Sequence, residues 1–480
     1  MTRNEGLGAW PARRASMSPG RAALVFEDRT TTYAELAVRI TKLAAQLRRA
    51  GVAAGDRVGY LGKNHPAFVE TMFATHVLGA IFVPFNVRLT APELAYQVAD
   101  SGVRVLVHAT EVAIDGPMTI RLDTEYEQWL ADGAADPIDA PVAQDDIALI
   151  LYTSGTTGRP KGAQLSHANL IWNTVNLLVG VDVCADEVTL VSAPLFHVAA
   201  LGQTLLPTLI KGGRAVLTSS WDVDGCFDLV AKHGVTLMFG VPTMFAALAA
   251  SSRWADADLS SVRTLMCGGA TVPEALIATY QTRGLVFCQG YGLTETAPGA
   301  TFLEAGESVR KIGSAGVPAF FTDVRVRGET GEILVRGPNV TPGYWLDPTA
   351  TAAALTDGWF HTGDLGRLDA EGHLYVVDRL KDMFVSGGEN VYPAEVENAI
   401  FTHPAVLDTA VVGVPDETWG EVGRAFVVCR PGACLSATEI REFLTPRLAK
   451  YKIPAHVEMV TELPRTGSGK VRKAELRRWP

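Results

Sequence analysis

The sequence predicts an α/β protein with a large N-terminal domain and a small C-terminal domain. Its 480 residues and 51.3 kDa exceed what one hydrophobic core usually serves, so at least two domains are expected. Strand-like and helix-like apolar patterns alternate through the first part of the chain, which is typical of parallel sheets covered by helices. Short strands and turns replace this alternation further along and indicate a small β subdomain.

The alternation begins with a helix. Thr32 and Glu35 have capping-box spacing, and an apolar helical stripe follows as far as Gly51. A second helix is expected near residues 70–78. Apolar runs predict the strands of this region at residues 58–61, 81–84, 189–192 and 215–217.

The pattern of predicted secondary structure changes near Val324. Short strands are expected at residues 324–326, 332–335 and 373–377, and a polar segment, 378–382, follows them. Pro393 suits the first position of a later helix. We therefore predict a domain boundary near Lys381, with a core over residues 1–379 and a C-terminal domain over residues 380–480.

Composition excludes several classes of protein. The net charge of −10 and pI near 5.5 give no general attraction to nucleic acid or to anionic membranes. We see no signal-peptide pattern and no apolar run long enough to cross a membrane. The six cysteines lack CxxC spacing, which disfavours zinc and suits a reducing compartment. We expect a cytoplasmic enzyme.

One segment, IALILYTSGTTGRPKGA, carries the strongest functional signal. The apolar run Ile147–Leu151 predicts a buried strand, which leads into a loop of hydroxyl side chains and glycines closed by Lys161. Glycines let backbone N–H groups approach an anion, hydroxyls add donors, and lysine adds a cation. The loop is therefore predicted to wrap polyphosphate, with these residues: Thr153, Ser154, Gly155, Thr156, Thr157, Gly158 and Lys161.

This loop differs from the common GxxxxGK[ST] phosphate loop. Gly162, rather than a Mg²⁺-binding Ser or Thr, follows Lys161. The first convincing helix start is Ser166, a candidate N-cap. We therefore expect a hairpin to hold the phosphates, which argues against P-loop kinases and motor ATPases.

Four further clusters could surround one nucleotide. The glycine-rich residues 267–270 could lie against a flat base, although the same pattern suits an ordinary strand-to-helix turn. Residues 289–296 offer an aromatic face, a hydroxyl and a carboxylate suited to Mg²⁺. Asp364 suits the two hydroxyls of a ribose, and Lys470 stands on a glycine-flanked loop within residues 464–470.

Together and in order, these motifs resemble the adenylate-forming (ANL) superfamily of acyl-CoA synthetases, adenylation domains and firefly-type luciferases. The resemblance runs from Thr32 to Lys470 through YTSGTTGRPKG, QGYGLTE, GWFHTGD, DRLKD, SGGENVYPAEVE and PRTGSGK. Within the superfamily the chain looks most like bacterial fatty or aryl acyl-CoA ligases. The resemblance implies an N-terminal domain of two βα-layered subdomains plus a small distorted β-barrel, and a small mobile α+β C-terminal domain.

The resemblance also implies roles for matching residues. The loop around Lys161 would close over the β- and γ-phosphates of ATP, Thr294 would touch the α-phosphate, and Glu295 would ligate Mg²⁺. Asp364 and Arg379 would hold the ribose. The adenine would be framed by Gly268, Gly269, Ala270, Gln289, Gly290 and Tyr291.

The implied reaction has two halves. Lys470 would bridge the substrate carboxylate and the α-phosphate, because two anions must meet when the acyl-adenylate forms. The C-terminal domain would then rotate about Lys381, withdraw Lys470, and bring Gly387 and Gly388 to the pantetheine tunnel. A thiol, expected to be that of CoA, would take the acyl group and release AMP.

The acid is predicted only by class. His197 matches a position that gates the acyl pocket, and amino-acid-activating relatives place an aspartate there. Gly292 stands where acetate-specific relatives place tryptophan, so a larger acid is expected. We find no arginine placed for a second carboxylate, and the expected lining is apolar: Phe239, Gly240, Val241, Met244, Ala297 and Pro298. Medium- or long-chain fatty acids and aryl acids remain.

Alternatives remain open at this point. The acyl group could pass to a carrier-protein pantetheine or to an amine instead of CoA. A non-catalytic or luciferase-like protein is disfavoured, because every catalytic position is filled. Monomer and homodimer are both compatible with the sequence.

Overall fold

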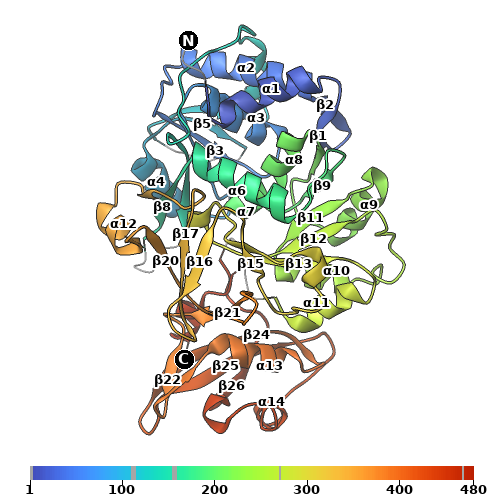
Figure 1. Cartoon of the computed structure of the whole chain (residues 1–480), viewed down its shortest axis with the longest axis vertical. Helices are drawn as coiled ribbons and strands as arrows, with labels where there is room; N and C mark the ends of the chain where they lie inside the picture. Colours follow the sequence, from blue (N-terminus) through green and yellow to red (C-terminus); the bar gives the residue numbers. More distant parts are fainter. Residues whose placement is uncertain (1–3, 110–114, 154–158, 270–271, 467–469, 480) are drawn as a thin grey trace.

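The computed structural model describes residues 4–109, 115–153, 159–269, 272–466 and 470–479. The chain starts in two helix-covered sheets, passes through an antiparallel sheet, and ends in a separate lower unit that contains β22 to β26 (Figure 1). This order confirms the predicted α/β class, with two βα-layered units before the β subdomain and the C-terminal domain.

The first sheet carries the predicted phosphate hairpin. Its order is β18-β8-β7-β4-β3-β5-β6, and β3 to β7 lie parallel, whereas β8 turns back antiparallel to β7. The apolar run predicted to start the hairpin is buried in β7. The strands are β3 Arg57–Leu61, β4 Ile81–Phe85, β5 Val103–His108, β6 Met118–Arg121, β7 Ile147–Thr153, β8 Lys161–Ser166 and β18 Gly343–Tyr344.

The second sheet has nine strands in the order β15-β14-β13-β12-β11-β9-β10-β1-β2. Its strands β11, β12 and β13 run parallel, so the segments that follow them meet at one edge. The strands are β1 Ala22–Phe26, β2 Arg29–Thr32, β9 Val188–Val191, β10 Arg214–Leu217, β11 Leu237–Gly240, β12 Thr264–Cys267, β13 Phe287–Tyr291, β14 Thr301–Phe302 and β15 Val317–Pro318.

Helices cover both sheets and begin where their caps predict. Thr32 and Glu35 form the predicted capping box of α2, and Ser166 caps α6. The α-helices are α1 Trp10–Met17, α2 Tyr33–Arg49, α3 Pro66–Val77, α4 Ala91–Ser101, α5 Tyr126–Ala131, α6 His167–Gly180, α7 Val198–Ala200, α8 Leu206–Lys211, α9 Val223–His233, α10 Pro242–Ala250 and α11 Glu274–Gln281. A π-helical turn, η2 Leu201–Leu205, joins α7 to α8.

The predicted β subdomain is a five-stranded antiparallel sheet built on β16-β17-β20-β19, with β21 paired to β20. Helix α12 (Pro348–Ala354) packs beside β19 and β20, and the short η3 (Thr294–Thr296) precedes β14 of the nine-stranded sheet. The strands are β16 Asp323–Val326, β17 Gly331–Arg336, β19 Leu355–Thr356, β20 Trp359–Leu368 and β21 Leu374–Arg379.

The C-terminal unit has its own five-stranded sheet and its own apolar core, which includes Val396, Val411 and Ile440. Pro393 begins α13, as predicted. The last strand of the preceding sheet ends at Arg379. The elements are β22 Phe384–Ser386, β23 Glu389–Val391, α13 Pro393–Phe401, β24 Val406–Asp416, β25 Gly420–Cys429, α14 Ala437–Leu444, β26 His456–Met459 and α15 Lys473–Leu476.

Most predicted strands differ from the observed ones by one or two residues at an end. The helix predicted near residues 70–78 instead begins at Pro66, because the His65 side chain caps it by accepting from Ala67 N at 3.1 Å. Among the described residues, no helix has the length and apolar character needed to cross a membrane.

Candidate active site

A cleft of about 3780 Å³ lies between the C-terminal unit and the sheets of the N-terminal part. Ser154–Gly158 and Ala270 lie outside the described residues, so their predicted contacts are not placed. The cleft is lined by most of the other predicted site residues, namely Thr153, Lys161, His197, Gly268, Gly269, Gln289, Gly290, Tyr291, Thr294, Glu295, Asp364, Arg379, Lys381 and Lys470. These residues come from segments spread over most of the chain.

The predicted phosphate hairpin is anchored from two sides. Strand pairing sets Thr153 opposite Lys161, so the two ends of the loop stand together at the cleft. The Tyr152 hydroxyl donates to the Asp100 carboxylate at 2.6 Å, and Trp345 Nε1 donates to the Asp100 carbonyl at 3.1 Å. The base of the loop is thereby fixed to α4 and to the segment after β18.

Glu295 is a buried carboxylate held by a tyrosine. The Tyr344 hydroxyl donates to Glu295 Oε1 at 2.8 Å, and Lys161 Nζ lies 5.3 Å from the centre of the Tyr344 ring. Burial, and then the charge of Glu295, raise the pKa of Tyr344, which therefore stays protonated and able to donate. One side chain thus connects the hairpin lysine to the predicted Mg²⁺ ligand.

A metal ion at Glu295 would need ligands from the substrate. No cluster of three or more His, Cys, Asp or Glu side chains suited to a metal occurs in the part of the chain that the structure describes. Mg²⁺ is commonly bound by one or two carboxylates together with phosphate oxygens and water. Glu295, with Thr294 beside it at the cleft, fits this type of site.

Backbone forms the wall predicted to face the base. An added Cβ at Gly268 would lie 3.2 Å from the Gly290 carbonyl oxygen, so the ends of β12 and β13 approach closely. Gly269 has φ +84°, a conformation that favours glycine. The Gln289 side chain is buried at this wall, and its Nε2 has no hydrogen-bond partner among the described residues. An unpaired buried donor suits a polar ligand such as a base edge.

Asp364 is the second buried carboxylate of the cleft. The Tyr291 hydroxyl donates to its Oδ2 at 2.8 Å, and Arg379 Nε lies 3.4 Å from its Oδ1. Burial raises the pKa of Asp364, whereas the charge of Arg379 and the Tyr291 hydrogen bond lower it. Strand pairing sets Asp364 opposite Arg379, so β20 and β21 present both groups together.

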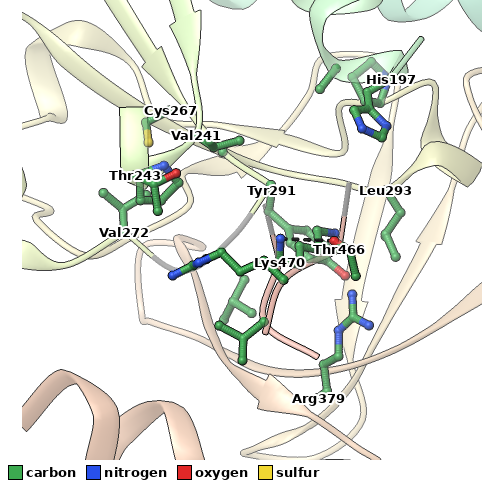
Figure 2. A pocket seen from close by; sticks show the side chains of 18 of the residues that line it. His197, Val241, Thr243, Cys267, Val272, Tyr291, Leu293, Arg379, Thr466 and Lys470 are labelled. Atoms are coloured by element: carbon green, nitrogen blue, oxygen red, sulfur yellow. Dashed lines mark hydrogen bonds between the residues drawn. The ribbon is translucent and has the colours of Figure 1, made fainter. Parts of the chain in front are cut away.

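Lys470 enters the same cleft from the C-terminal unit. Its backbone N–H donates to Thr466 Oγ1 at 3.2 Å, and Arg465 forms an isolated β-bridge with Val471. Figure 2 shows Lys470 and Thr466 in the region of Tyr291 and Arg379, with His197 farther away. Its side chain keeps contact with solvent, but surrounding protein lowers the pKa of Lys470 by desolvation, as does the charge of Arg379. The charges of Asp364 and Glu295 oppose this shift.

The predicted lining of the acyl pocket is apolar, but two of the predicted residues do not take part in it. Phe239, Val241, Met244 and Pro298 line the cleft, and His197 lies at the start of α7 with its ring 4.8 Å from that of Phe196. Gly240 and Ala297 are not among the lining residues, because they pack into the core behind the wall.

Gly292 lines the cleft, and the neighbouring backbone requires a glycine at this position. A Cβ at this position would lie 1.7 Å from the Pro298 carbonyl oxygen. The backbone of residues 297–298 therefore requires a glycine here, which is a second reason for this residue beside the predicted open pocket wall. No side chain could be added here without moving that backbone.

Two predicted positions lie apart from the rest. Gly387 and Gly388 do not line the cleft in this arrangement, and a Cβ at Gly387 would lie 2.6 Å from the Trp419 ring. Lys381 does line the cleft, and its backbone carbonyl accepts from Arg477 at 3.4 Å.

Sequence reasoning missed two residues that hold the site. Tyr344 reaches Glu295 only because the two-residue strand β18 pairs with β8. Glu332 accepts from Gly363 N at 3.2 Å and lies 2.9 Å from His361 Nδ1, which holds the part of β20 that precedes Asp364. Both contacts join residues far apart in sequence, so no local pattern could indicate them.

A phosphate-type hairpin, a buried carboxylate beside it, and a lysine from a second unit define an enzyme that activates a substrate with a nucleotide. Comparison with known families identifies this class further. The chain belongs to the AMP-binding enzyme family, whose model matches residues 11–345, and the AMP-binding enzyme C-terminal domain matches residues 395–470.

Full-length relatives agree with this assignment. The chain is 53% identical to a feruloyl-CoA synthase of Amycolatopsis sp., with 99% of each chain covered. It is 42% identical to an indoleacetate–CoA ligase of Aromatoleum aromaticum, with 98% of this chain and 97% of the relative covered. The predicted class, an AMP-forming acid–CoA ligase that acts through an acyl-adenylate, is confirmed.

Solved structures support the fold and the cofactors. The chain matches the o-succinylbenzoate CoA synthetase of Bacillus subtilis in complex with its acyl-adenylate at a TM-score of 0.90 and 34% identity, with 98% of each chain covered. The same enzyme in complex with ATP and magnesium ion matches at a TM-score of 0.89 and 34% identity, with 98% of this chain and 99% of that chain covered. The expectation of ATP and Mg²⁺ as cofactors is thereby supported.

Gly292→Ala tests whether the neighbouring backbone requires a glycine at this position. We expect the free energy of unfolding to fall by about 1–3 kcal/mol, because a backbone carbonyl must move. Urea denaturation measures this loss, and turnover of short and long acids should fall together. Gly306→Ala is the control, since no atom lies within 4 Å of its added Cβ. A stable Gly292→Ala protein that gains activity on short acids would instead support the open-wall interpretation.

Proposed function

We propose that this enzyme activates an aryl carboxylic acid of the hydroxycinnamate type and transfers the acyl group to CoA. The observation that carries the proposal is 53% identity, over 99% of both chains, to a feruloyl-CoA synthase. The apolar side of the cleft, with Phe239 and Met244, suits an aromatic ring. His197 stands where an aspartate would favour an amino acid, which agrees with an uncharged acyl chain.

We assign the nucleotide to the two buried carboxylates and the hairpin. Asp364 and Arg379 would hold the ribose, and the wall of Gly268, Gly290 and Tyr291 would hold the adenine. Thr153 and Lys161 would face the β- and γ-phosphates, with Ser154–Gly158 completing the loop. Mg²⁺ bound by Glu295 would neutralise phosphate charge during attack. The unpaired Gln289 donor and the close backbone wall support this placement.

Lys470 would act on the first half of the reaction. A carboxylate must approach the α-phosphate, so the main barrier is repulsion between two anions. A cation held between the two groups lowers that barrier, and Thr294 would add a hydroxyl at the α-phosphate. Lys470 points into the cleft where Asp364 and Glu295 act on its charge, which supports adenylate formation in this arrangement of the chain.

The second half of the reaction would need a different arrangement. We propose that residues 1–379 and 380–480 move relative to each other about Lys381, and that Gly387 and Gly388 then reach the pantetheine path. Their position outside the present cleft and the separate apolar core of the C-terminal domain support this proposal. All six cysteines are free thiols, which supports a reducing, cytoplasmic location.

An acid panel tests the proposed substrate. With ATP and Mg²⁺, we expect CoA-dependent AMP release to be fastest with ferulate and 4-hydroxycinnamate, and slower with benzoate and with fatty acids of medium and long chain. Chromatography of the CoA thioesters measures the products. Faster turnover of a fatty acid would contradict the aryl assignment, and transfer only to a carrier protein or an amine would contradict the CoA assignment.

Lys470→Ala tests whether Lys470 acts in the first half-reaction and not in the second. We expect the rate of acyl-adenylate formation to fall by at least about 100-fold, because one electrostatic stabiliser of the transition state is lost. Pyrophosphate exchange measures this rate. Thioester formation from supplied acyl-adenylate should stay within a few-fold of the unmodified enzyme. Equal losses in both half-reactions would show that Lys470 has a structural role.

Tyr344→Phe tests whether the tyrosine positions Glu295. The variant keeps the ring beside Lys161 but removes the hydroxyl that donates to Glu295. We expect the Mg²⁺ concentration for half-maximal pyrophosphate exchange to rise about 10-fold, as is typical when a group that orients a metal ligand is lost. Tyr375→Phe, at a second cleft-lining tyrosine, is the control. An unchanged Mg²⁺ dependence would disprove the positioning role.

A further inference from the structure

Gln203 is a buried amide in the wall of the cleft. The residue is 8% exposed, yet it is one of the residues that line the cavity. Its Oε1 is buried and has no hydrogen-bond partner among the described residues. Leaving a polar atom both buried and unpaired is costly, so native structures usually supply a partner.

The local backbone explains why this side chain faces the cavity. Gln203 lies in the π-helical turn η2, between α7 and α8. A π-helical turn contains one extra residue and shifts the direction of the side chains that follow, and such turns are frequent at functional sites. On the same turn, the Thr204 hydroxyl is instead paired with the Ala200 carbonyl.

The turn is held in place by contacts with the active-site backbone. Asn173 Nδ2 donates to the Gly202 carbonyl at 3.1 Å, and Asn173 Oδ1 accepts from Gly299 N at 2.9 Å. An added Cβ at Gly202 would lie 2.5 Å from Pro298 Cδ. Gln203 is therefore fixed relative to the segment that carries Glu295, and the unpaired atom is not explained by a loose loop.

The position suits the far end of a bound acid. Gln203 follows His197 by six residues, and its π-helical turn packs against β11, the strand that carries Phe239. Val198, Ala199 and Ala200 on the preceding residues and Phe239 on the adjacent β11 also line the cavity, so Gln203 lies next to an apolar part of its wall. Such a single polar group in an apolar pocket commonly fixes ligand orientation and specificity.

The Gln203 amide indicates which substituent the acid carries at the end distant from its carboxylate. A carboxamide is uncharged and offers both a donor and an acceptor, which matches a neutral hydroxyl that can do both. A second carboxylate would favour a cation, and a plain hydrocarbon would leave the amide unpaired. A ring that carries a hydroxyl therefore satisfies both the apolar wall and Gln203.

We propose that Gln203 is a specificity-determining residue that hydrogen-bonds a ring hydroxyl of the aryl acid at the end distant from the carboxylate. This inference rests on the proposed aryl-acid function and adds the selection for hydroxylated over unsubstituted rings. The hydroxyl of a 4-hydroxycinnamate would pair with the buried amide, whereas cinnamate would bury the amide without a partner. A site built to bond a substrate hydroxyl rejects analogues that lack it.

The Gln203→Leu variant tests this proposal. Both it and the unmodified enzyme are assayed with 4-hydroxycinnamate and with cinnamate. We expect the unmodified enzyme to favour 4-hydroxycinnamate in kcat/KM for CoA thioester formation. The variant should lose about 10-fold on 4-hydroxycinnamate, the effect of one net hydrogen bond, and should keep or gain activity on cinnamate. The ratio of the two acids should therefore fall. Gln203→Met, which is unbranched and similar in volume, repeats the test if leucine does not fold.

Thr204→Val is the matched control. It removes a hydroxyl from the same turn that already bonds the Ala200 carbonyl, so the ratio of the two acids should stay unchanged. A Gln203 variant that folds and loses both acids equally, or that keeps the original ratio, would overturn the inference while the aryl-acid function stands. An unmodified enzyme that activates no aryl acid would overturn both.

Discussion

Two buried carboxylates in one cleft constrain the rest of the structure. Glu295 and Asp364 are both removed from solvent, and each accepts a hydrogen bond from a tyrosine hydroxyl at 2.8 Å. A cation stands close to each of these pairs, Lys161 over the ring of Tyr344 and Arg379 beside Asp364. A buried charge without such partners would be strongly unfavourable.

The fold supplies these partners from separate sheets. Tyr291 comes from the end of a parallel strand, Asp364 and Arg379 come from paired antiparallel strands, and Tyr344 comes from a strand added beside the phosphate hairpin. The cleft therefore exists only when the first three sheets are assembled. The C-terminal unit has its own core and adds Lys470 to the lining of the cleft.

Much of this organisation could be predicted from the sequence, because it depends on local patterns. The capping box of Thr32 and Glu35, the N-cap Ser166 and the proline at the start of α13 set helix starts through contacts within a few residues. The hairpin was predicted because glycine, hydroxyl and lysine residues follow one another. Gly292 shows the limit of such reasoning, since the Pro298 carbonyl that also requires a glycine there comes close only in the folded chain.

The sequence by itself determined the class of chemistry, because each nucleotide-binding motif is a contiguous stretch of residues and the motifs follow one another in a specific order. It also determined the α/β pattern through the periodicity of apolar residues. Only the tertiary structure decided which groups support the site and which wall meets the acid. Tyr344, Glu332 and Gln203 act across long sequence separations or through burial, and their partners or lack of partners arise only when distant segments pack together.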